Sequence, residues 1–362
     1  MNVVFRVDAS LQIGSGHLMR CLTFAERLHK SEDANITFIT RDLEGNLIDL
    51  IKLQGYSVFV LPRSADERKD LCGYEAWLTV DKETDAAETE TVLREMPWID
   101  FLIIDSYAID AVWERKIRPH VRKIVVIDDL ANRVHDCDIL LDQNFYLDKD
   151  TRYNGLVPES CRCFLGPQYV LLRQEFYDIR KRLRKRTGKI ERILVFYGGV
   201  DLTNETEKAI SAILKSGIVA HVDVIVGQGN PHKKKIRVLC NQHENMIYHC
   251  QVSNIGDYMN ASDISLGGGG TATWERCFLG LPTIVTSVAD NQTASCIACG
   301  KAGYIWYLGV ASEVQEETIK QALWRANQPG ALEWFQHQCQ LNISGEAGAC
   351  LLDYLERGFL NQ

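Results

Sequence analysis

Short apolar segments alternate with amphipathic segments along the first half of the chain. The apolar segments span residues 3–7, 36–40, 58–61, 101–105, 123–129 and 137–142. Between them, three segments have the spacing of amphipathic helices: residues 17–28, 47–53 and 86–95. Strands that are apolar on both faces and separated by helices are typical of a parallel sheet covered on both sides.

The second half repeats this alternation. Its apolar segments span residues 192–197, 222–226, 246–250, 264–266, 283–286 and 304–308, with a helix expected at 205–215 and a helical region at the end. The sequence therefore predicts the α/β class, with two Rossmann-like, doubly wound parallel-sheet domains. We expect the carboxyl ends of their strands to face a shared cleft in which ligands bind.

The domain bounds follow from these segments. We place the N-terminal domain at residues 1–178, a linker at 179–190 and the C-terminal domain at 191–362. The linker holds the basic run 180–186, which we interpret as a solvated linker or a helix end. The last helix is expected to pack back on the N-terminal domain.

Length and composition agree with this division. At 362 residues the chain is too long for one ordinary core, and its 46% hydrophobic and 24% charged residues are typical of a soluble globular protein. We see no signal-peptide pattern and no apolar run long enough to cross a bilayer, so we expect a cytoplasmic protein without a membrane partner. A net charge of −8 disfavours nucleic acid as a partner.

The cysteines do not indicate a disulfide scaffold or a metal site. Twelve cysteines in a chain this long do not make a disulfide scaffold, and Cys21, Cys240, Cys277 and Cys350 lie in apolar stretches typical of small buried residues. The C-x-x-C at 296–299 has no second pair and no histidines at ligand spacing. No His, Asp and Glu set has metal spacing either, so we expect no metal and no cofactor.

A glycine-rich loop after the first strand carries a histidine. The loop contains Gly14 and Gly16, which let a ligand approach the backbone closely, and His17 stands at the start of the helix that follows. A helix amino terminus favours an anionic ligand. We therefore predict that His17 is a catalytic base beside an anionic substrate.

Polar residues follow several strands of the N-terminal domain. They are Asp8, Asp105, Tyr107, Asp128 and Asp129. Because they follow strands of one parallel sheet, we expect them to cluster at the same edge as His17. The hydroxyl of Tyr107 is a candidate for a hydrogen bond to a sugar or to its leaving oxygen. Each carboxylate is equally well interpreted as a loop cap.

A second glycine-rich loop lies in the C-terminal domain. Four glycines at 267–270 precede Thr271, and Glu275 lies one helical turn further on. Free backbone N–H groups there suit a diphosphate, and Glu275 suits the two hydroxyls of a ribose. A flexible turn with an ordinary glutamate is the alternative, but turns rarely use four glycines. The loop fits neither an ATPase nor an NAD motif.

Two further groups of polar or flexible residues end strands of this domain. Gly198 and Gly199 are expected to meet the ligand through their backbone, or to form a tight turn that Asp201 caps. Asn291 and Gln292 suit recognition of substrate amides or hydroxyls, with simple helix capping by Asn291 as the alternative.

These stretches together resemble a known family. The matching segments are residues 5–8, 13–17, 43–46, 103–107, 137–141, 198–201 and 290–292, including the opening Gly14-x-Gly16-His17-x-x-Arg20. The chain resembles the UDP-2,4-diacetamido-2,4,6-trideoxy-β-L-altropyranose hydrolases of pseudaminic acid biosynthesis. That family is similar in fold to inverting glycosyltransferases of the GT-B type, including MurG.

The resemblance implies a role for each candidate residue. It implies that water, held near His17, attacks the sugar C1–O bond with inversion and without a metal. The residues assigned to the sugar are Asp8, Gly14, Gly16, Tyr107, Asn291 and Gln292. The residues assigned to UDP are Gly198, Gly199, Gly268, Gly269, Gly270, Thr271 and Glu275. The tetraglycine departs from the family pattern by having more glycine.

We therefore expect a nucleotide-sugar hydrolase. It would act as a monomer on a UDP-activated diacetamido sugar and release UDP and 2,4-diacetamido-2,4,6-trideoxy-L-altrose, a step toward glycosylated flagellin or a surface polysaccharide. The alternatives are a GT-B UDP-sugar glycosyltransferase, a hydrolysing UDP-sugar 2-epimerase and a binding protein without catalytic activity.

Overall fold

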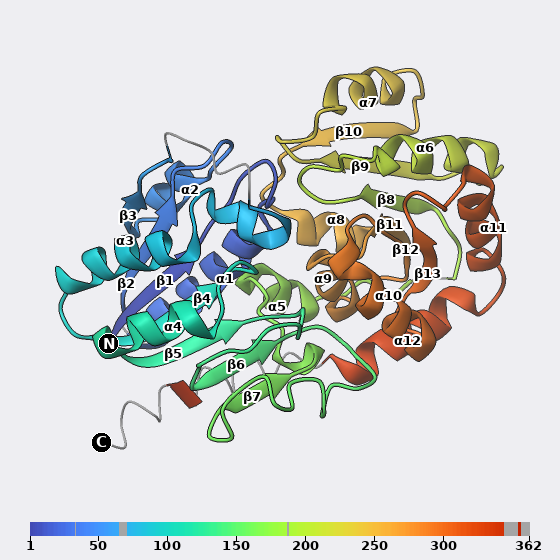
Figure 1. Cartoon of the computed structure of the whole chain (residues 1–362). Coiled ribbons are helices and arrows are strands. Elements are labelled where there is room, and N and C mark those ends of the chain that lie inside the picture. Colours follow the sequence, from blue (N-terminus) through green and yellow to red (C-terminus); the bar gives the residue numbers. More distant parts are fainter. Residues whose placement is uncertain (33, 65–70, 187, 344–353, 356–362) are drawn as a thin grey trace. The chain divides into compact units, whose positions relative to one another are not determined.

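Two parallel β-sheets form the framework of the chain. The computed structural model describes residues 1–32, 34–64, 71–186, 188–343 and 354–355 (Figure 1). The chain divides into two compact units. Unit 1 comprises Met1–Asn144, Asp148–Leu171 and Glu346–Gln362, and unit 2 comprises Phe145–Leu147 and Leu172–Gly345.

Unit 1 is built on a seven-stranded sheet. Its strands are β1 (Asn2–Val7), β2 (Asn35–Arg41), β3 (Ser57–Leu61), β4 (Ile99–Asp105), β5 (Val121–Ile127), β6 (Ile139–Asp142) and β7 (Arg162–Leu165). Its helices are α1 (Gly16–Glu32), α2 (Ile48–Leu53), α3 (Lys82–Arg94) and α4 (Ala111–Ile117), with 3₁₀ turns η1 (Gly73–Leu78), η2 (Arg118–His120) and η3 (Pro167–Tyr169). The strand order is β3-β2-β1-β4-β5-β6-β7.

Unit 2 repeats the plan with six strands. They are β8 (Arg192–Phe196), β9 (His221–Val226), β10 (Met246–Cys250), β11 (Ile264–Gly268), β12 (Thr283–Ser287) and β13 (Trp306–Val310), in the order β10-β9-β8-β11-β12-β13. The helices are α5 (Gln174–Arg180), α6 (Glu205–Lys215), α7 (Lys233–Cys240), α8 (Ile255–Ala261), α9 (Ala272–Phe278), α10 (Asp290–Ala302), α11 (Glu316–Ala326) and α12 (Ala331–Asn342).

The strand pairing confirms the predicted α/β class with two doubly wound parallel sheets. Every neighbouring pair of named strands is parallel. In each unit the strand order reverses between the first and fourth strands, β1 and β4 in unit 1 and β8 and β11 in unit 2. Doubly wound sheets bind ligands beside the carboxyl ends of the two strands at this reversal.

Successive side chains along each strand of unit 1 point to opposite faces of the sheet, and both faces are packed. On β1, Phe5 packs with Phe24 of α1 and stacks on Phe38 of β2 with ring centroids 4.9 Å apart, whereas Val4 faces the cluster that includes Trp113 of α4. Because both faces are apolar, the strands have near-continuous hydrophobic sequences, which is the pattern that predicted them.

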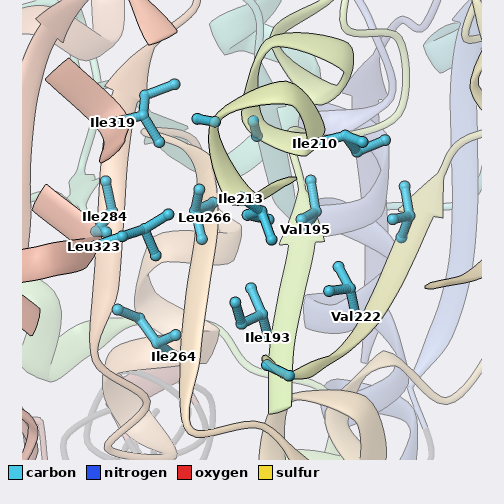
Figure 2. Close-up of a cluster of buried hydrophobic side chains, with 14 of the residues drawn as sticks. Ile193, Val195, Ile210, Ile213, Val222, Ile264, Leu266, Ile284, Ile319 and Leu323 are labelled. Atoms are coloured by element: carbon cyan, nitrogen blue, oxygen red, sulfur yellow. The ribbon is translucent and has the colours of Figure 1, made fainter. Parts of the chain in front are cut away.

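The largest cluster of unit 2 lies between its sheet and two helices. Figure 2 shows Ile193 and Val195 of β8 and Leu266 of β11 close to Ile213 of α6 and Leu323 of α11. The branched side chains on the strands interdigitate with the apolar stripe of each helix. This packing fixes β8 beside β11 and therefore fixes the loops that follow them.

The division between the units falls earlier than the linker expected at residues 179–190. Unit 2 begins at Leu172 because α5 packs against α8 and α9. The basic run is not simply solvated: Arg184 forms an ion pair with Asp263, and Arg186 is buried and donates to four backbone carbonyls of unit 2. These contacts hold the expected linker to unit 2.

Two residues of the C-terminal segment are described, and both contact unit 1. Leu355 is buried in its core, and the ring of Tyr354 meets Phe164 at 5.6 Å. The rest of the predicted last helix, and Cys350, lie outside the described residues. The structure also adds elements that the sequence patterns did not predict, among them η1 and β7, which are too short to show a period.

Asp142, at the end of β6, is a buried acid whose ion pair with Arg152 is long. It accepts hydrogen bonds of 3.0 Å from the Tyr153 hydroxyl and from the Asn144 amide, and Arg152 lies 3.5 Å away. Burial, followed by the neighbouring charge of Asp129, raises the pKa of Asp142 to about 8. The folded chain therefore retains this proton at neutral pH.

The raised pKa of Asp142 predicts a pH-dependent stability difference. The unfolded chain releases this proton near pH 3.8, so between that pH and about 8 the folded state binds more protons and the free energy of unfolding falls as pH rises. The limiting slope is about 1.4 kcal/mol per pH unit. Asp142→Asn removes the titration, so the variant should gain stability relative to the wild type as pH rises from about 5 to 8.

Urea unfolding across this pH range measures the effect. Asp150→Asn, at an exposed position of the same unit, is the control. Its free energy of unfolding should change with pH as that of the wild type does. If the free energy of unfolding had the same pH dependence in Asp142→Asn and in the wild type, Asp142 would be ionised in the folded protein.

Candidate active site

The loop after β1 places His17 at the start of α1. The turn closes with a 2.8 Å hydrogen bond from the Gly14 amide to the Ser10 carbonyl, and Gly14 has φ +80°. This left-handed conformation favours glycine. A Cβ at Gly16 would meet no heavy atom within 4 Å, so the space beside this residue is open. The tight turn thus delivers His17 to the edge of the sheet.

His17 is fixed by Asp105 at the end of β4. Strand pairing sets Val7 of β1 opposite Asp105, and the His17 Nδ1 atom lies 2.6 Å from Asp105 Oδ1. Arg20 binds the same carboxylate with two 2.8 Å hydrogen bonds. Since Asp105 accepts the proton on Nδ1, we assign the neutral ring the tautomer in which Nε2 is the free acceptor.

The charges around Asp105 keep it ionised. Burial alone would raise the pKa of this carboxyl, but Arg20 and then His17 outweigh it and hold the pKa well below its usual range. An anionic carboxylate on Nδ1 orients the imidazole and stabilises the imidazolium that forms when Nε2 takes a proton. The arrangement is therefore suited to general-base chemistry.

Tyr107 lies beside His17, but its hydroxyl is already engaged. The hydroxyl donates to Asp129 over 2.5 Å, and Asn144 donates to the same carboxylate over 2.9 Å. The Tyr107 ring meets the imidazole edge to face, with centroids 4.6 Å apart. The single proton of this hydroxyl is thus used on Asp129, which does not favour the predicted donation to a sugar oxygen.

Two aromatic residues near His17 were missed from the sequence. Trp77 lies 5.9 Å from the His17 ring centroid, and Tyr74 lies 5.0 Å from that of Tyr107. Both are on η1, where a period of three residues brings positions i and i+3 to one side. The spacing Y-x-x-W was the available signal, but a segment this short has no recognisable helical pattern.

Asp8 does not contact His17. Its carboxylate accepts 2.7 Å hydrogen bonds from Arg6 and from the Arg41 backbone amide, and both arginines also bind Asp85. Of the candidate acids, Asp105 thus contacts His17 directly, and Asp129 is linked to it through Tyr107. Asp8 belongs to a separate buried ion-pair network.

The four glycines of unit 2 divide into two kinds. A Cβ at Gly267 would lie 2.1 Å from Arg276 Nη1, and one at Gly269 would lie 2.1 Å from Cys296 Sγ. At Gly268 and Gly270 the closest atoms would be 3.4 and 3.5 Å away. Packing therefore explains why residues 267 and 269 are glycines, whereas Gly268 and Gly270 leave space at the carboxyl end of β11.

Backbone donors gather at this loop. The carbonyl of Gly270 accepts from Thr273 in the first turn of α9, but in the described part of the chain the amides of Gly270 and Thr271 have no acceptor. Thr271 itself makes no side-chain capping bond. Free N–H groups at a strand end are suited to an anion.

Glu275 is partly buried beside Arg173. Burial raises the pKa of Glu275, and Arg173, 3.6 Å away, partly offsets this. At the neighbouring strand β8, Gly198 has φ +99°, and Asp201 accepts hydrogen bonds from the amides of Glu205 and Thr206. Asp201 therefore caps α6, in agreement with the capping alternative.

Gln292 lies with the glycine loop. Its Oε1 accepts from the Val288 amide over 3.0 Å, and its Nε2 would be 3.5 Å from a Cβ at Gly270. Asn291 is inside α10, whose N-cap is Ala289, so the alternative in which Asn291 caps the helix is wrong. The structure thus places Gln292 beside residues assigned to UDP.

Other features bear less on the site. Within the described ranges, no group of three or more His, Cys, Asp and Glu side chains is arranged to hold a metal ion. No described helix is both long enough and apolar enough to span a membrane. A surface hollow of about 720 Å³ in unit 2, lined by Lys189, Val219 and Trp324 among others, includes none of the predicted site residues.

Comparison with known proteins gives one relative of moderate identity. No protein-family model matches the chain. The UDP-2,4-diacetamido-2,4,6-trideoxy-beta-L-altropyranose hydrolase of Campylobacter jejuni subsp. jejuni serotype O:2 is 30% identical over 305 residues, which cover 84% of this chain and 98% of the relative. The spore coat polysaccharide biosynthesis protein SpsG of Bacillus subtilis is 23% identical over 325 residues, covering 88% of this chain and 87% of SpsG.

Solved structures are similar over nearly the whole chain. Acinetobacter baumannii MurG matches with a TM-score of 0.66 and 11% identity, and Phytolacca americana UGT2 with 0.70 and 12%. Each alignment covers 98% of this chain and 99% of the other. At such low identity the likeness shows the fold alone, which is of the GT-B type.

The contrast between Gly269 and Gly270 predicts different effects of the same substitution. Gly269→Ala forces a methyl group against the buried Cys296 thiol and should lower the free energy of unfolding by about 1–3 kcal/mol. Gly270→Ala meets only an ordinary contact and should be close to neutral. Adding Cys296→Ala to Gly269→Ala should recover part of the loss in a double-mutant cycle.

Urea denaturation of the wild type, the two glycine variants, Cys296→Ala and the double variant is the measurement. Equal stabilities for the two glycine variants, or additive effects in the cycle, would contradict the packing of Gly269 against Cys296.

Proposed function

Since the chain belongs to the family of the UDP-2,4-diacetamido-2,4,6-trideoxy-β-L-altropyranose hydrolases, we propose that it hydrolyses that sugar nucleotide. The products are UDP and 2,4-diacetamido-2,4,6-trideoxy-L-altrose, formed by attack of water at the anomeric carbon with inversion. The observation that carries the proposal is the His17–Asp105 pair, in which the His17 Nδ1 atom lies 2.6 Å from the carboxylate.

The proposed chemical step uses His17 as general base. As the water oxygen bonds to C1, its proton passes to Nε2, and the bond from C1 to the phosphate oxygen breaks with its electron pair leaving on UDP. Asp105 stabilises the imidazolium, and the two hydrogen bonds from Arg20 keep the carboxylate in place. This is the role expected for a buried acid behind a catalytic histidine.

We assign the leaving group to the glycine loop of unit 2. The amides of Gly268, Gly269 and Gly270 together with Gly198, Gly199 and Thr271 are proposed to bind the diphosphate, and Glu275 the ribose. The free amides after β11 support this assignment, because preorganised N–H donors stabilise charge that develops on a leaving group.

We assign the sugar to residues near His17 and near Gln292. The proposed set is Asp8, Gly14, Gly16, Tyr107, Asn291 and Gln292, as in the sequence-based prediction. The open space beside Gly16 and the ring faces of Tyr74 and Trp77 support binding of a sugar that carries methyl and acetamido groups. Contacts of Asp8 with Arg6 make it the least supported member.

The finer parts of the prediction are retained as proposals. We propose that the reaction needs no metal ion and no cofactor, takes place in the cytoplasm and serves pseudaminic acid biosynthesis. A GT-B glycosyltransferase is the main alternative because the fold is shared with such enzymes. Release of UDP without an added acceptor distinguishes the two.

Replacing His17 tests the proposed base. His17→Ala should bind UDP as the wild type does and lose roughly 10²–10⁴ in turnover, the usual contribution of a positioned base. His29→Ala, a substitution of another histidine on the same helix, is the matched control and should keep full activity. The assay measures UDP release from the UDP-diacetamido sugar with EDTA present and no acceptor.

Labelled water identifies the bond that breaks. In H₂¹⁸O, the label should appear in the free sugar and not in UDP, as read by mass spectrometry. Near wild-type turnover of His17→Ala would exclude it as the base, label in UDP would move the attack to phosphorus, and turnover only with an acceptor would indicate a transferase. Loss of activity with EDTA would reject metal independence.

Gly16→Ala separates substrate approach from folding. The new methyl meets nothing in the protein and lies at the first residue of a helix, so the melting temperature should be unchanged or higher. If the sugar occupies that space, kcat/KM should fall at least about tenfold, a loss of about 1.4 kcal/mol in transition-state binding. Unaltered kinetics in a stable variant would move the sugar away from Gly16.

A further inference from the structure

Arg276 is a fully buried cation beneath the glycine loop. It lies on α9, and its Nη2 donates to the Gly268 carbonyl over 2.6 Å and to Thr273 Oγ1 over 3.1 Å. Its Nη1 is the atom that a Cβ at Gly267 would meet. The guanidinium therefore packs directly against the inner side of the loop.

Half of this guanidinium has no partner. Arg276 Nε and Nη1 are buried and make no hydrogen bond, and in the described part of the chain no carboxylate forms an ion pair with it. The adjacent Glu275 lies instead beside Arg173. Buried charges in proteins are normally paired or bound to a ligand, because removing them from water is costly.

Arg186 provides a contrast within the same unit. It is also buried and also lacks a carboxylate at ion-pair distance among the described residues, but its Nε, Nη1 and Nη2 all donate to carbonyls, those of Ser262, Leu279, Gly280 and Met259. Arg186 is accounted for by its structural contacts. Arg276 differs because its Nε and Nη1 atoms have no such acceptors among the described residues.

The bond to Gly268 fixes the direction of the next amide. In a trans peptide the C=O of Gly268 and the N–H of Gly269 point to opposite sides. Arg276 holds the Gly268 carbonyl on one side of this peptide, so the N–H of Gly269 lies on the other side, toward Thr286 of β12, the ladder partner of Gly268. A cation bound to the carbonyl also polarises the peptide and strengthens its N–H as a donor.

We propose that Arg276 is a positioning residue for the leaving diphosphate: it fixes the Gly268 peptide at the end of β11 and supplies a positive charge behind the loop. This inference rests on the proposed function, since it requires UDP to bind at this loop. It gives the tetraglycine a specific electrostatic partner. A Cβ at Gly267 would collide with both this guanidinium and the Phe196 carbonyl of β8.

The test compares UDP with uridine, which has the same base and ribose but no phosphate. Calorimetry would be carried out on the wild type, Arg276→Gln, Arg276→Lys and the matched control Arg186→Gln. Arg276→Gln should weaken UDP binding at least about tenfold and change uridine binding less than about twofold. Arg276→Lys keeps the charge and should retain most of the preference for UDP.

The control separates this role from a structural one. Arg186→Gln should lower the melting temperature and leave the ratio of UDP to uridine affinity unchanged. Three results would overturn the inference. The ratio of UDP to uridine affinity in Arg276→Gln could equal that of the wild type, this ratio could fall equally in Arg276→Gln and Arg186→Gln, or the wild type could bind UDP no more tightly than uridine. A wild type that prefers UDP through Arg276 but fails to hydrolyse the sugar nucleotide would refute the proposed function and leave the inference standing.

A second measurement covers the case in which Arg276→Gln does not fold. The side-chain Nε–H signal of Arg276 in the ¹⁵N-labelled wild type, assigned by its loss in Arg276→Lys, should shift on adding UDP and not on adding uridine. No shift with UDP would contradict the proposal.

Discussion

The parallel pairing of β1 with β4 is the constraint on which the candidate site of unit 1 depends. It sets Val7 opposite Asp105, so that the loop leaving β1 and the acid ending β4 meet at one edge of the sheet. Asp105 then holds both His17 and Arg20. Without this register the imidazole would have no fixed orientation, because nothing in the flexible glycine turn determines which nitrogen faces outward.

Unit 2 uses the same strand order for a different purpose. The reversal between β8 and β11 brings two glycine-containing loops to one edge, and the packing of α6 and α11 on these strands keeps them there. Unit 1 offers an oriented imidazole, whereas unit 2 offers backbone amides and a buried cation. The two units thus share an architecture and differ in the chemistry that their strand ends present.

Family and fold support different conclusions here. The GT-B type of fold is common to this chain and to glycosyltransferases of 11% and 12% identity, so it does not select a reaction. The relative from Campylobacter jejuni, aligned over 98% of its length, indicates a sugar-nucleotide hydrolase. The His17–Asp105 geometry suits that chemistry, since a general base is what activation of water requires.

The sequence by itself determined the fold class, every strand except β7, the position of His17 and the two glycine-rich loops, because apolar periodicity and glycine clusters are local signals. Only the tertiary structure decided which polar residues meet: Asp105 joins His17, whereas Asp8 pairs with Arg6, although both follow apolar strands. It also revealed Trp77 and Arg276, whose roles depend on what lies beside them. Contacts between residues far apart in the chain are set by strand register and helix packing, which no local pattern encodes.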